Sequence, residues 1–353
     1  MSFLRVLGLA ALAARAAALL PSPVLPGDLF YGTCNLPACS TLEFAAFNLS
    51  TQASTDLFDF PTDEFEDGYV ADDVLIQSGG STEVVISLQY DNATSRGYLA
   101  TFDLARRALV GGVQSPFCFA LYLDPAQPAG STDSLLCLSL GAPAPCGATT
   151  QCTYVSRVSR TTGAVTQLSV IMPDYCPFTV DALDPVQGVI FSTFEECSGA
   201  GGPLIATIDA RTGAVKSMAH FAYTLAFIEF EYRAKDGRIY AVVQDSSNAA
   251  QPVAYLGTVD PATATPTPLG PAAYYNVSFP PATGGFINQF NTISTISEDA
   301  GAFFFTAFHY AIPGPPPSDP ILHLIGSDLT TGALVYDAVV ANPFCEILWV
   351  PSA

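Results

Sequence analysis

The sequence predicts an all-β protein built from six similar antiparallel units arranged in a ring. From Gly27 onward, alternating and β-branched runs are separated by Gly, Pro, Asp and Ser clusters, without a convincing helical period. A short hairpin turn recurs six times, at intervals of 50 to 68 residues. The first unit lacks one strand, which the far end of the chain can supply.

Residues 1–18 have the pattern of a secretory signal peptide. Arg5 precedes an apolar stretch at 6–14, and the small residues at 16–18 offer a cleavage site. Arg15 interrupts the apolar run, which is too short to span a bilayer, and no later stretch approaches a membrane span. We therefore expect a secreted protein, or one in the lumen of the secretory pathway. Cleavage after Ala18 leaves 10 basic and 32 acidic residues, a net charge of −22.

The composition limits the classes of partner. The chain has 353 residues, half of them hydrophobic, with a formal net charge of −20 and only two lysines, Lys216 and Lys235. Such a surface repels nucleic acid phosphates and anionic lipid heads, so we expect neither as a partner. The acidic excess keeps an apolar protein soluble, and it can also attract cations or basic partners.

The repeated turn begins with Asp, Asn or Ser, and Thr often follows three residues later. Its first residues are Asn48, Asp103, Ser159, Asp209, Asp260 and Asp328. A side-chain oxygen there accepts hydrogen bonds from backbone N–H groups two or three residues on. Gly163, Gly213 and Gly332 supply a positive φ at the end of the turn. We therefore interpret the turn as a structural hairpin rather than a site of chemistry.

Two further strands precede each hairpin, so a unit holds four antiparallel strands, A to D. For the last three units, the expected A and B strands are Phe178–Leu183 and Val189–Phe194, Phe227–Tyr232 and Arg238–Val243, and Thr292–Ser297 and Ala302–His309. Four-stranded units repeated around a circle are the plan of a β-propeller.

The two ends of the chain indicate how the ring closes. One strand, near Leu29–Thr33, precedes the first hairpin, and Cys345–Pro351 can supply the missing A strand. We therefore predict a single six-bladed domain at 19–353, closed by the C-terminal strand and monomeric. The predicted blades are 27–60 with 343–353, 66–113, 114–170, 174–221, 222–269 and 273–340.

The chain thus resembles the broad class of six-bladed secreted propellers over its whole mature length. The D-x-x-T-G turn is shared by many propeller groups, including quinoprotein-like repeats. Those repeats each carry a docking tryptophan, whereas this chain has only Trp349. The resemblance therefore implies the fold and no particular family.

The nine cysteines lack the paired CxxC spacing of a zinc site, so we predict disulfides. Antiparallel A and B strands bring the start of A beside the end of B. The predicted bridges are Cys34–Cys345, Cys118–Cys137, Cys146–Cys152 and Cys176–Cys197, with Cys39 left free or replacing Cys34. Glycosylation sequons, which also fit secretion, occur at Asn48, Asn92 and Asn276.

Long B–C and D–A loops should share one face of the ring, around the channel mouth. They are Phe60–Gly68, Gly141–Gln151, Ser198–Gly202, Ser246–Pro252, Pro271–Gln289 and Tyr310–Pro320. Loops on a rigid scaffold commonly carry function, so we expect a protein, glycan or small-molecule ligand on this face. The acidic run 63–67 belongs to it, and we interpret that run as a solvated loop.

Acidic and amide side chains near the starts of A strands suggest a second kind of site. The candidate ligands are Asp73, Asp181, Glu229, Asn291 and Glu346. Oxygen ligands suit Ca²⁺. This set is similar to that of gluconolactonase-like propellers, where the resemblance implies a channel metal that serves hydrolysis. Asp181 stands seven residues before Gly188 and Glu229 eight before Gly237, so a β-bulge is needed for both to face the channel.

The sequence leaves three hypotheses for function. The first is a secreted binding or interaction protein that uses the loop-rich face. The second is a Ca²⁺-dependent hydrolase or lactonase with an acidic channel site. The third is a structural extracellular glycoprotein. The sequence has no Gly-x-Ser-x-Gly element and no phosphate loop, so it identifies no catalytic residue.

Overall fold

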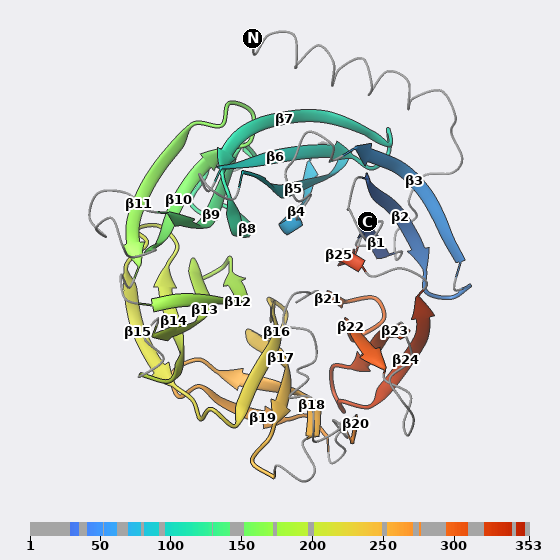
Figure 1. Cartoon of the computed structure of the whole chain (residues 1–353), viewed down its shortest axis with the longest axis vertical. Helices are drawn as coiled ribbons and strands as arrows, with labels where there is room; N and C mark the ends of the chain where they lie inside the picture. Colours follow the sequence, from blue (N-terminus) through green and yellow to red (C-terminus); the bar gives the residue numbers. More distant parts are fainter. Residues whose placement is uncertain are drawn as a thin grey trace.

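A computed structural model describes residues 29–34, 41–51, 53–61, 70–78, 81–91, 96–128, 130–141, 152–171, 175–196, 201–248, 253–270, 275–276, 294–309, 321–340 and 344–349. Within these ranges the regular elements are all β-strands, arranged as antiparallel sheets around a central axis (Figure 1). The chain is therefore a β-propeller, as the sequence predicts.

The described strands form five four-stranded sheets and one five-stranded sheet. The terminal sheet, which joins strands from both ends of the chain, has the order β25 (Phe344–Trp349), β1 (Leu29–Cys34), β2 (Thr41–Asn48), β3 (Ala53–Pro61). The next is β4 (Val70–Ser78), β5 (Ser81–Asp91), β6 (Arg96–Asp103), β7 (Ala108–Pro116). Then comes β8 (Cys118–Leu123), β9 (Ser134–Gly141), β10 (Cys152–Ser159), β11 (Val165–Ile171).

The remaining sheets follow in chain order. One is β12 (Tyr175–Asp184), β13 (Val189–Glu196), β14 (Pro203–Asp209), β15 (Val215–His220). The five-stranded sheet is β16 (Leu225–Arg233), β17 (Arg238–Asp245), β18 (Val253–Asp260), β19 (Thr265–Pro268), with β20 (Tyr275–Asn276) also on β18. The last is β21 (Ser294–Ser297), β22 (Ala302–His309), β23 (Ile321–Asp328), β24 (Leu334–Val340).

The terminal sheet contains the predicted pairing between the two ends of the chain. Strand β1 pairs with β2 on one side and with β25 on the other, so that Leu29 lies opposite both Phe47 and Trp349. The C-terminal strand thus occupies the A position of this sheet.

Two strands differ from the approximate division into blades that we predicted. Tyr275–Asn276, expected to open the last unit, pairs with β18 instead, opposite Val253 and Ala254. Strand β19 ends at Pro268, and β20 adds a second short segment on the same side of β18. Strand β7 continues to Pro116, past the expected boundary at 113, because it stays paired with β6 up to Arg96.

Burial follows the position of a strand within its sheet. Strand β13 is buried from Val189 to Phe194, because both of its faces pack against neighbouring sheets. The outer strand β15 is mostly exposed. The inner strands therefore place side chains of both faces in the core, whereas the outer strands bury little.

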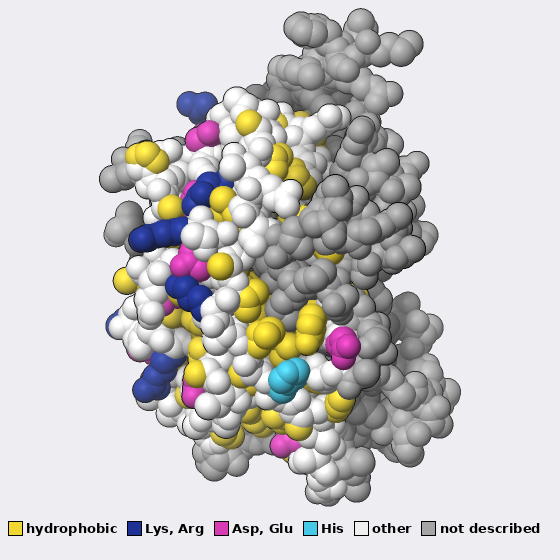
Figure 2. Space-filling view, turned by 90° about the vertical axis from the view of Figure 1, so that its left-hand side faces the viewer, with side chains coloured by type: hydrophobic (Ala, Val, Ile, Leu, Met, Phe, Trp, Pro, Cys, Tyr) yellow, Lys and Arg dark blue, Asp and Glu magenta, His cyan; other side chains and the backbone are white. Residues whose placement is uncertain are grey.

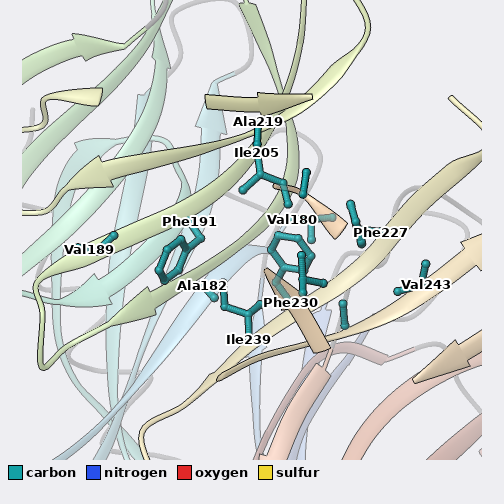
Figure 3. Close-up of a cluster of buried hydrophobic side chains, with 13 residues drawn as sticks. Val180, Ala182, Val189, Phe191, Ile205, Ala219, Phe227, Phe230, Ile239 and Val243 are labelled. Carbon is teal, nitrogen blue, oxygen red and sulfur yellow. The ribbon is translucent and has the colours of Figure 1, made fainter. Parts of the chain in front are cut away.

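The hydrophobic core lies in the seams between neighbouring sheets. In the seam between the β12–β15 and β16–β20 sheets, Phe191 and Ile205 pack with Phe227 and Phe230 (Figure 3). Equivalent clusters join the β8–β11 sheet to the sheets before and after it, and the β16–β20 sheet to the β21–β24 sheet. Each sheet is thus stabilised mainly by its neighbours in the ring.

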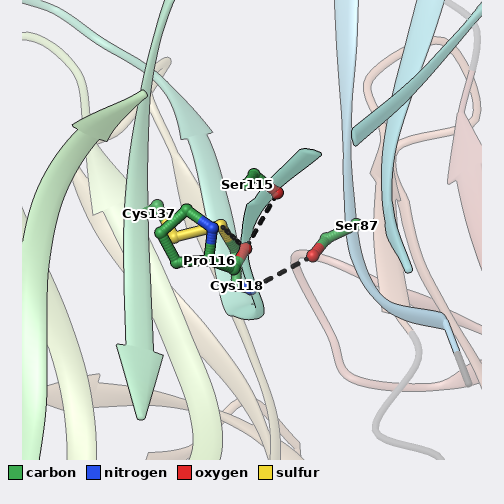
Figure 4. The surroundings of a disulfide bond; sticks show 5 residues. All are labelled: Ser87, Ser115, Pro116, Cys118 and Cys137. Atoms are coloured by element: carbon green, nitrogen blue, oxygen red, sulfur yellow. Dashed lines mark hydrogen bonds between the residues drawn. A yellow bond between two sulfur atoms is a disulfide. The ribbon is translucent and has the colours of Figure 1, made fainter. Parts of the chain in front are cut away.

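One predicted disulfide is confirmed within the β8–β11 sheet. Cys118 opens β8 and is bonded to Cys137 of β9, with a Cα–Cα distance of 5.2 Å (Figure 4). The Cys118 N–H also donates to Ser87 Oγ of the β4–β7 sheet, at 3.2 Å. The bridge therefore lies at a seam between two sheets.

Candidate functional site

The six repeated turns are capped as the sequence predicts. In each, the first residue's side-chain oxygen accepts a backbone N–H two or three residues on, from Thr51, Arg106, Thr162, Thr212, Ala262 and Thr331 in the six turns. At Asp209, a hydrogen bond from Lys216 at 2.9 Å lowers the carboxyl pKa to about 2. These side chains are committed to the hairpins, so the repeated motif is structural.

In the five turns whose last residue is described, that residue adopts a left-handed conformation. Its φ is 69° at Gly163, 71° at Gly213 and 67° at Gly332. The same position holds Arg107 at φ 52° and Ala264 at φ 51°. The sequence identified the glycines, but the two side chains that bear the same strained backbone were missed.

Arginines on the C–D and A–B turns tie neighbouring sheets together. Arg160 pairs with Glu83 of the β4–β7 sheet. Arg157 binds Asp124 at 2.8 Å and donates to the Arg211 carbonyl of the β12–β15 sheet at 3.1 Å. We call such an ion pair or hydrogen bond, made by a side chain at a turn to the neighbouring sheet, a clasp.

The seam between the β16–β20 and β21–β24 sheets has the most complete clasp. Arg233 Nε and Nη2 each donate to Glu298 at 2.8 Å, in the forked geometry that arginine favours with carboxylates. Ser294 Oγ also donates to Glu231 at 2.9 Å. On the preceding seam, burial and a hydrogen bond to Asp184 raise the pKa of Tyr232 to about 12.

The two edges of the sheets differ in length of connection and in charge. We call the edge with the A–B and C–D turns the turn edge, and the edge with the B–C and D–A connections the loop edge. Apart from Arg5 and Arg15 in the predicted signal peptide, the chain has ten Lys and Arg residues. Nine of them lie in the A–B and C–D turns or within three residues of these turns. Figure 2 shows the Lys and Arg side chains gathered along one side of the visible surface. The exception is Arg96, which begins β6 at the loop edge.

The loop edge is acidic by sequence and by structure. Its connections, among them 62–69, 142–151 and 310–320, contain no Lys or Arg. Of the described side chains there, Glu195 and Glu196 end β13, Asp245 ends β17 and Asp59 lies near the end of β3. Except for Arg96, the loop edge thus has acids without cations.

Four of the five proposed channel ligands lie on A strands. Asp73 on β4 is buried and lies opposite Ile86, and Asp181 on β12 lies opposite Ser192. The backbones of Glu229 on β16 and Glu346 on β25 lie opposite Val242 and Gly32. Asn291 lies outside the described residues.

The register divides these candidates into two sets. Across their sheets, Asp73 and Asp181 align with a C-strand residue three positions before the first residue of the C–D turn. Glu229 and Glu346 align with a residue four positions before it, so these positions belong to the other face of the strand. Bulges interrupt the A–B pairing in β4, β8, β12, β16 and β25, near the points where these residues lie. Among the described residues, no group of three or more His, Cys, Asp or Glu comes together as a metal site.

The remaining predicted positions are only partly described. Asn48, the first sequon, is half-buried and caps its own turn, whereas Asn92 lies outside the described residues and Asn276 contributes only its backbone, to β20. Cys152 and Cys176 are disulfide-bonded, and their expected partners, Cys146 and Cys197, lie outside the described residues. The same holds for Cys39, for the side chains of Cys34 and Cys345, and for the acidic run 63–67.

A search of the described residues for a helix long and apolar enough to cross a membrane finds none.

Comparison with known proteins identifies the fold alone. No protein-family model matches the chain, and no curated protein matches it in sequence. Among solved structures, a putative TolB from Agrobacterium tumefaciens is 12% identical, with a TM-score of 0.51 over 87% of this chain and 92% of that one. Kuenenia stuttgartiensis hydrazine synthase is 11% identical, with a TM-score of 0.50 over 95% and 92%. Raptor from Chaetomium thermophilum is 9% identical, with a TM-score of 0.50 over 94% of this chain and 27% of that one. Proteins this different in name share the architecture, so function has to be argued from the residues.

Proposed function

We propose that the protein is a secreted binding protein that holds its ligand at the loop edge, around the mouth of the central channel. The contrast between the two edges supports this proposal. Apart from the connection 124–133 between β8 and β9, the turn edge has short turns, whose polar groups are used in caps and clasps. The loop edge has long connections, such as 310–320 between β22 and β23, which are free to vary on a rigid scaffold.

The charge of the loop edge favours a neutral or basic partner. The run 63–67 adds four acidic residues to Glu195, Glu196 and Asp245 at this edge. A polyanion would be repelled here, whereas a basic protein segment, a neutral glycan or a small neutral molecule would not.

An array of immobilised glycans and peptides of graded net charge tests this assignment. A loop-edge variant neutralises the acidic run with D63N, E64Q, E66Q and D67N. A turn-edge variant, R211Q with K235Q, serves as the matched control. We expect neutral or basic spots that the loop-edge variant loses and the turn-edge variant keeps. Binding that depends on the turn edge alone would contradict the proposal.

We also propose that the ring is complete, with six blades closed by β25, in a single monomeric domain at 19–353. The pairing of β25 with β1 supports closure. So do the contacts of the A strands, since β4 contacts β25 and β8, and β21 contacts β16 and β25. Light scattering at micromolar protein tests the monomer, and a dimer would contradict that part.

Secretion is proposed from the signal pattern at 1–18, the cysteines and the three sequons. Expression in a eukaryotic secretory host tests it. The protein should leave the cell, begin at residue 19, and lose mass on treatment with a glycosidase. Retention in the cytosol with residues 1–18 intact would contradict it.

A Ca²⁺-dependent hydrolase is a second candidate. The shared register of Asp73 and Asp181 supports it, because two A strands then place a carboxylate at the same level. The test is a thermal melt with EDTA and with millimolar Ca²⁺, on the wild type and on D73N and D181N. A rise in Tm that both variants reduce would support the metal, and an unchanged wild-type Tm would count against it.

A further inference from the structure

Arg107 occupies a backbone position that four of the other five turns fill with glycine or alanine, and the first turn with Gln52. Its φ of 52° lies in the left-handed region, which is costly for a residue with a long side chain. At the same step of their turns stand Gly163, Gly213, Ala264 and Gly332. A strained residue at a position that tolerates glycine suggests that its side chain has a use of its own.

Among the described residues, the buried Arg107 side chain has no counter-ion. The residue is 4% exposed, and neither Nη1 nor Nη2 has a hydrogen-bond partner among the residues that the structure describes. Burial lowers the pKa of the guanidinium, yet an arginine keeps its proton in proteins. The described residues therefore leave a desolvated positive charge uncompensated.

The geometry of the other turns shows where this side chain must go. A Cβ added at Gly163 would meet the backbone of Gln114 on β7, in the preceding sheet. One added at Gly213 would lie 3.2 Å from Val155 Cβ on β10, again in the preceding sheet. Ala264 packs with Ile205 of the sheet before its own. By the same rule, Arg107 enters the seam between the β4–β7 sheet and the terminal sheet.

Two other arginines with mostly buried side chains are each paired with an acid. The side chains of Arg160 and Arg233 are 14% and 13% exposed, and each meets a carboxylate from a neighbouring sheet. The described acids on β3, Asp56 and Asp59, are exposed and form no pair with Arg107. The described residues of the seam at Arg107 thus provide the cation of a clasp without its carboxylate, and Asp28, which precedes β1, lies outside them.

We propose that Arg107 binds a small oxyanion of the carboxylate type within the seam between the terminal sheet and the β4–β7 sheet. Nη1 and Nη2 form the forked donor pair that matches two oxygens of one anion. The burial of Arg107 excludes a large ligand, so a free small acid is the expected occupant. Bound there, the anion completes the clasp that Glu298 and Glu83 supply at other seams. This inference does not depend on the proposed ligand at the loop edge.

Thermal melts in sodium acetate, exchanged for sodium chloride at a constant ionic strength of about 0.15 M, test the proposal, because charge screening is then unchanged. We expect acetate to raise the wild-type Tm saturably, by about 2–4 °C. R107Q should lose this rise. R107G, which installs the residue found in other turns, should also lose it and provides a second variant if R107Q folds poorly.

Arg106 supplies the matched control. Its side chain is 76% exposed in the same turn, so R106Q removes the same charge without touching the buried site. R106Q should keep the acetate response. An equal rise in Tm in the wild type and in R107Q or R107G would overturn the proposal. A wild-type Tm that does not change when acetate replaces chloride would also overturn it, because the site would then hold water or take chloride equally well.

Discussion

The seam between the β16–β20 and β21–β24 sheets and the seam between the terminal and β4–β7 sheets pack by different means. In the first, Arg233 and Glu298 form a two-bond clasp over an apolar cluster. In the second, Phe44 and Phe102 meet with ring centroids 5.2 Å apart, and the buried Arg107 pairs with no described carboxylate. Neighbouring sheets in one ring can therefore be joined by ion pairs or by aromatic packing.

The two seams differ in whether a described acid of the neighbouring sheet pairs with a buried arginine. A guanidinium at a turn is accommodated when the neighbouring sheet offers an acid, as Glu83 does for Arg160. At the seam with the terminal sheet, Phe44 packs on Phe102, and no described acid pairs with Arg107. The predictions below test this contrast, beginning with the largest effect.

Phe44→Ala should cost about 3–5 kcal/mol of unfolding free energy, the range for truncating a buried phenylalanine. Phe44 is 1% exposed and contacts Phe102 across the seam. Urea unfolding measures the loss. A cost below about 1 kcal/mol, the scale of one exposed polar contact, would show that the aromatic pair does not hold this seam.

Gly213→Ala should cost about 2–4 kcal/mol, because strain and overpacking add. The φ is 71°, and the new Cβ would lie 2.7 Å from Ser169 Cβ in the preceding sheet. Gly130→Ala is the control, since φ is 81° there and nothing lies within 4 Å. Equal losses for the two variants would mean that the turn position is not packed against its neighbour.

Arg233→Met should cost about 2 kcal/mol, the usual range for hydrogen bonds to a charged group. A double-mutant cycle with Glu298→Gln separates the pair from the rest of the side chain. Additive losses would show that the clasp contributes nothing as a pair. Strong coupling would sharpen the contrast with the aromatic seam.

Asp209→Asn should cost about 1 kcal/mol near neutral pH, after allowance for partial exposure. Asparagine keeps the capping oxygen, as Asn48 does, but loses the charge that Lys216 stabilises. The folded-state pKa, about 2, is depressed, so the benefit is present above the unfolded value near 4. The gap between variant and wild type should therefore stay constant above pH 4 and shrink as pH falls towards 2. A gap independent of pH in denaturant unfolding would refute this origin.

Sequence predicted the repeating parts of this molecule best. The turns at Asp209 and Asp328 were identifiable because capping chemistry is local and leaves the same residues in each copy. The pairing of Cys118 with Cys137 followed from the antiparallel A and B strands. The partnership of β1 with β25 followed from a missing strand.

The misses came from interactions between sheets and from irregular strands. No local pattern showed that Arg107 would be buried, because its surroundings come from another sheet. The one available signal was an arginine at the glycine position of the turn. Asp181 and Glu229 lie at different registers, as their counts of seven and eight residues to Gly188 and Gly237 indicate, because the bulges in β12 and β16 fall before these residues and do not realign them. The short strand β20 was likewise missed, since two residues carry no period.

The pairing of Leu29 with Trp349 has a consequence for the order of assembly during synthesis. Strands β1 to β3 emerge early from the ribosome, but the inner edge of β1 has no partner until β25 has been made. An open edge strand can pair with another chain. During synthesis, one unpaired strand edge therefore stays exposed until the end of the chain has been made. We expect a chaperone that limits aggregation of the nascent chain to act mainly at β1.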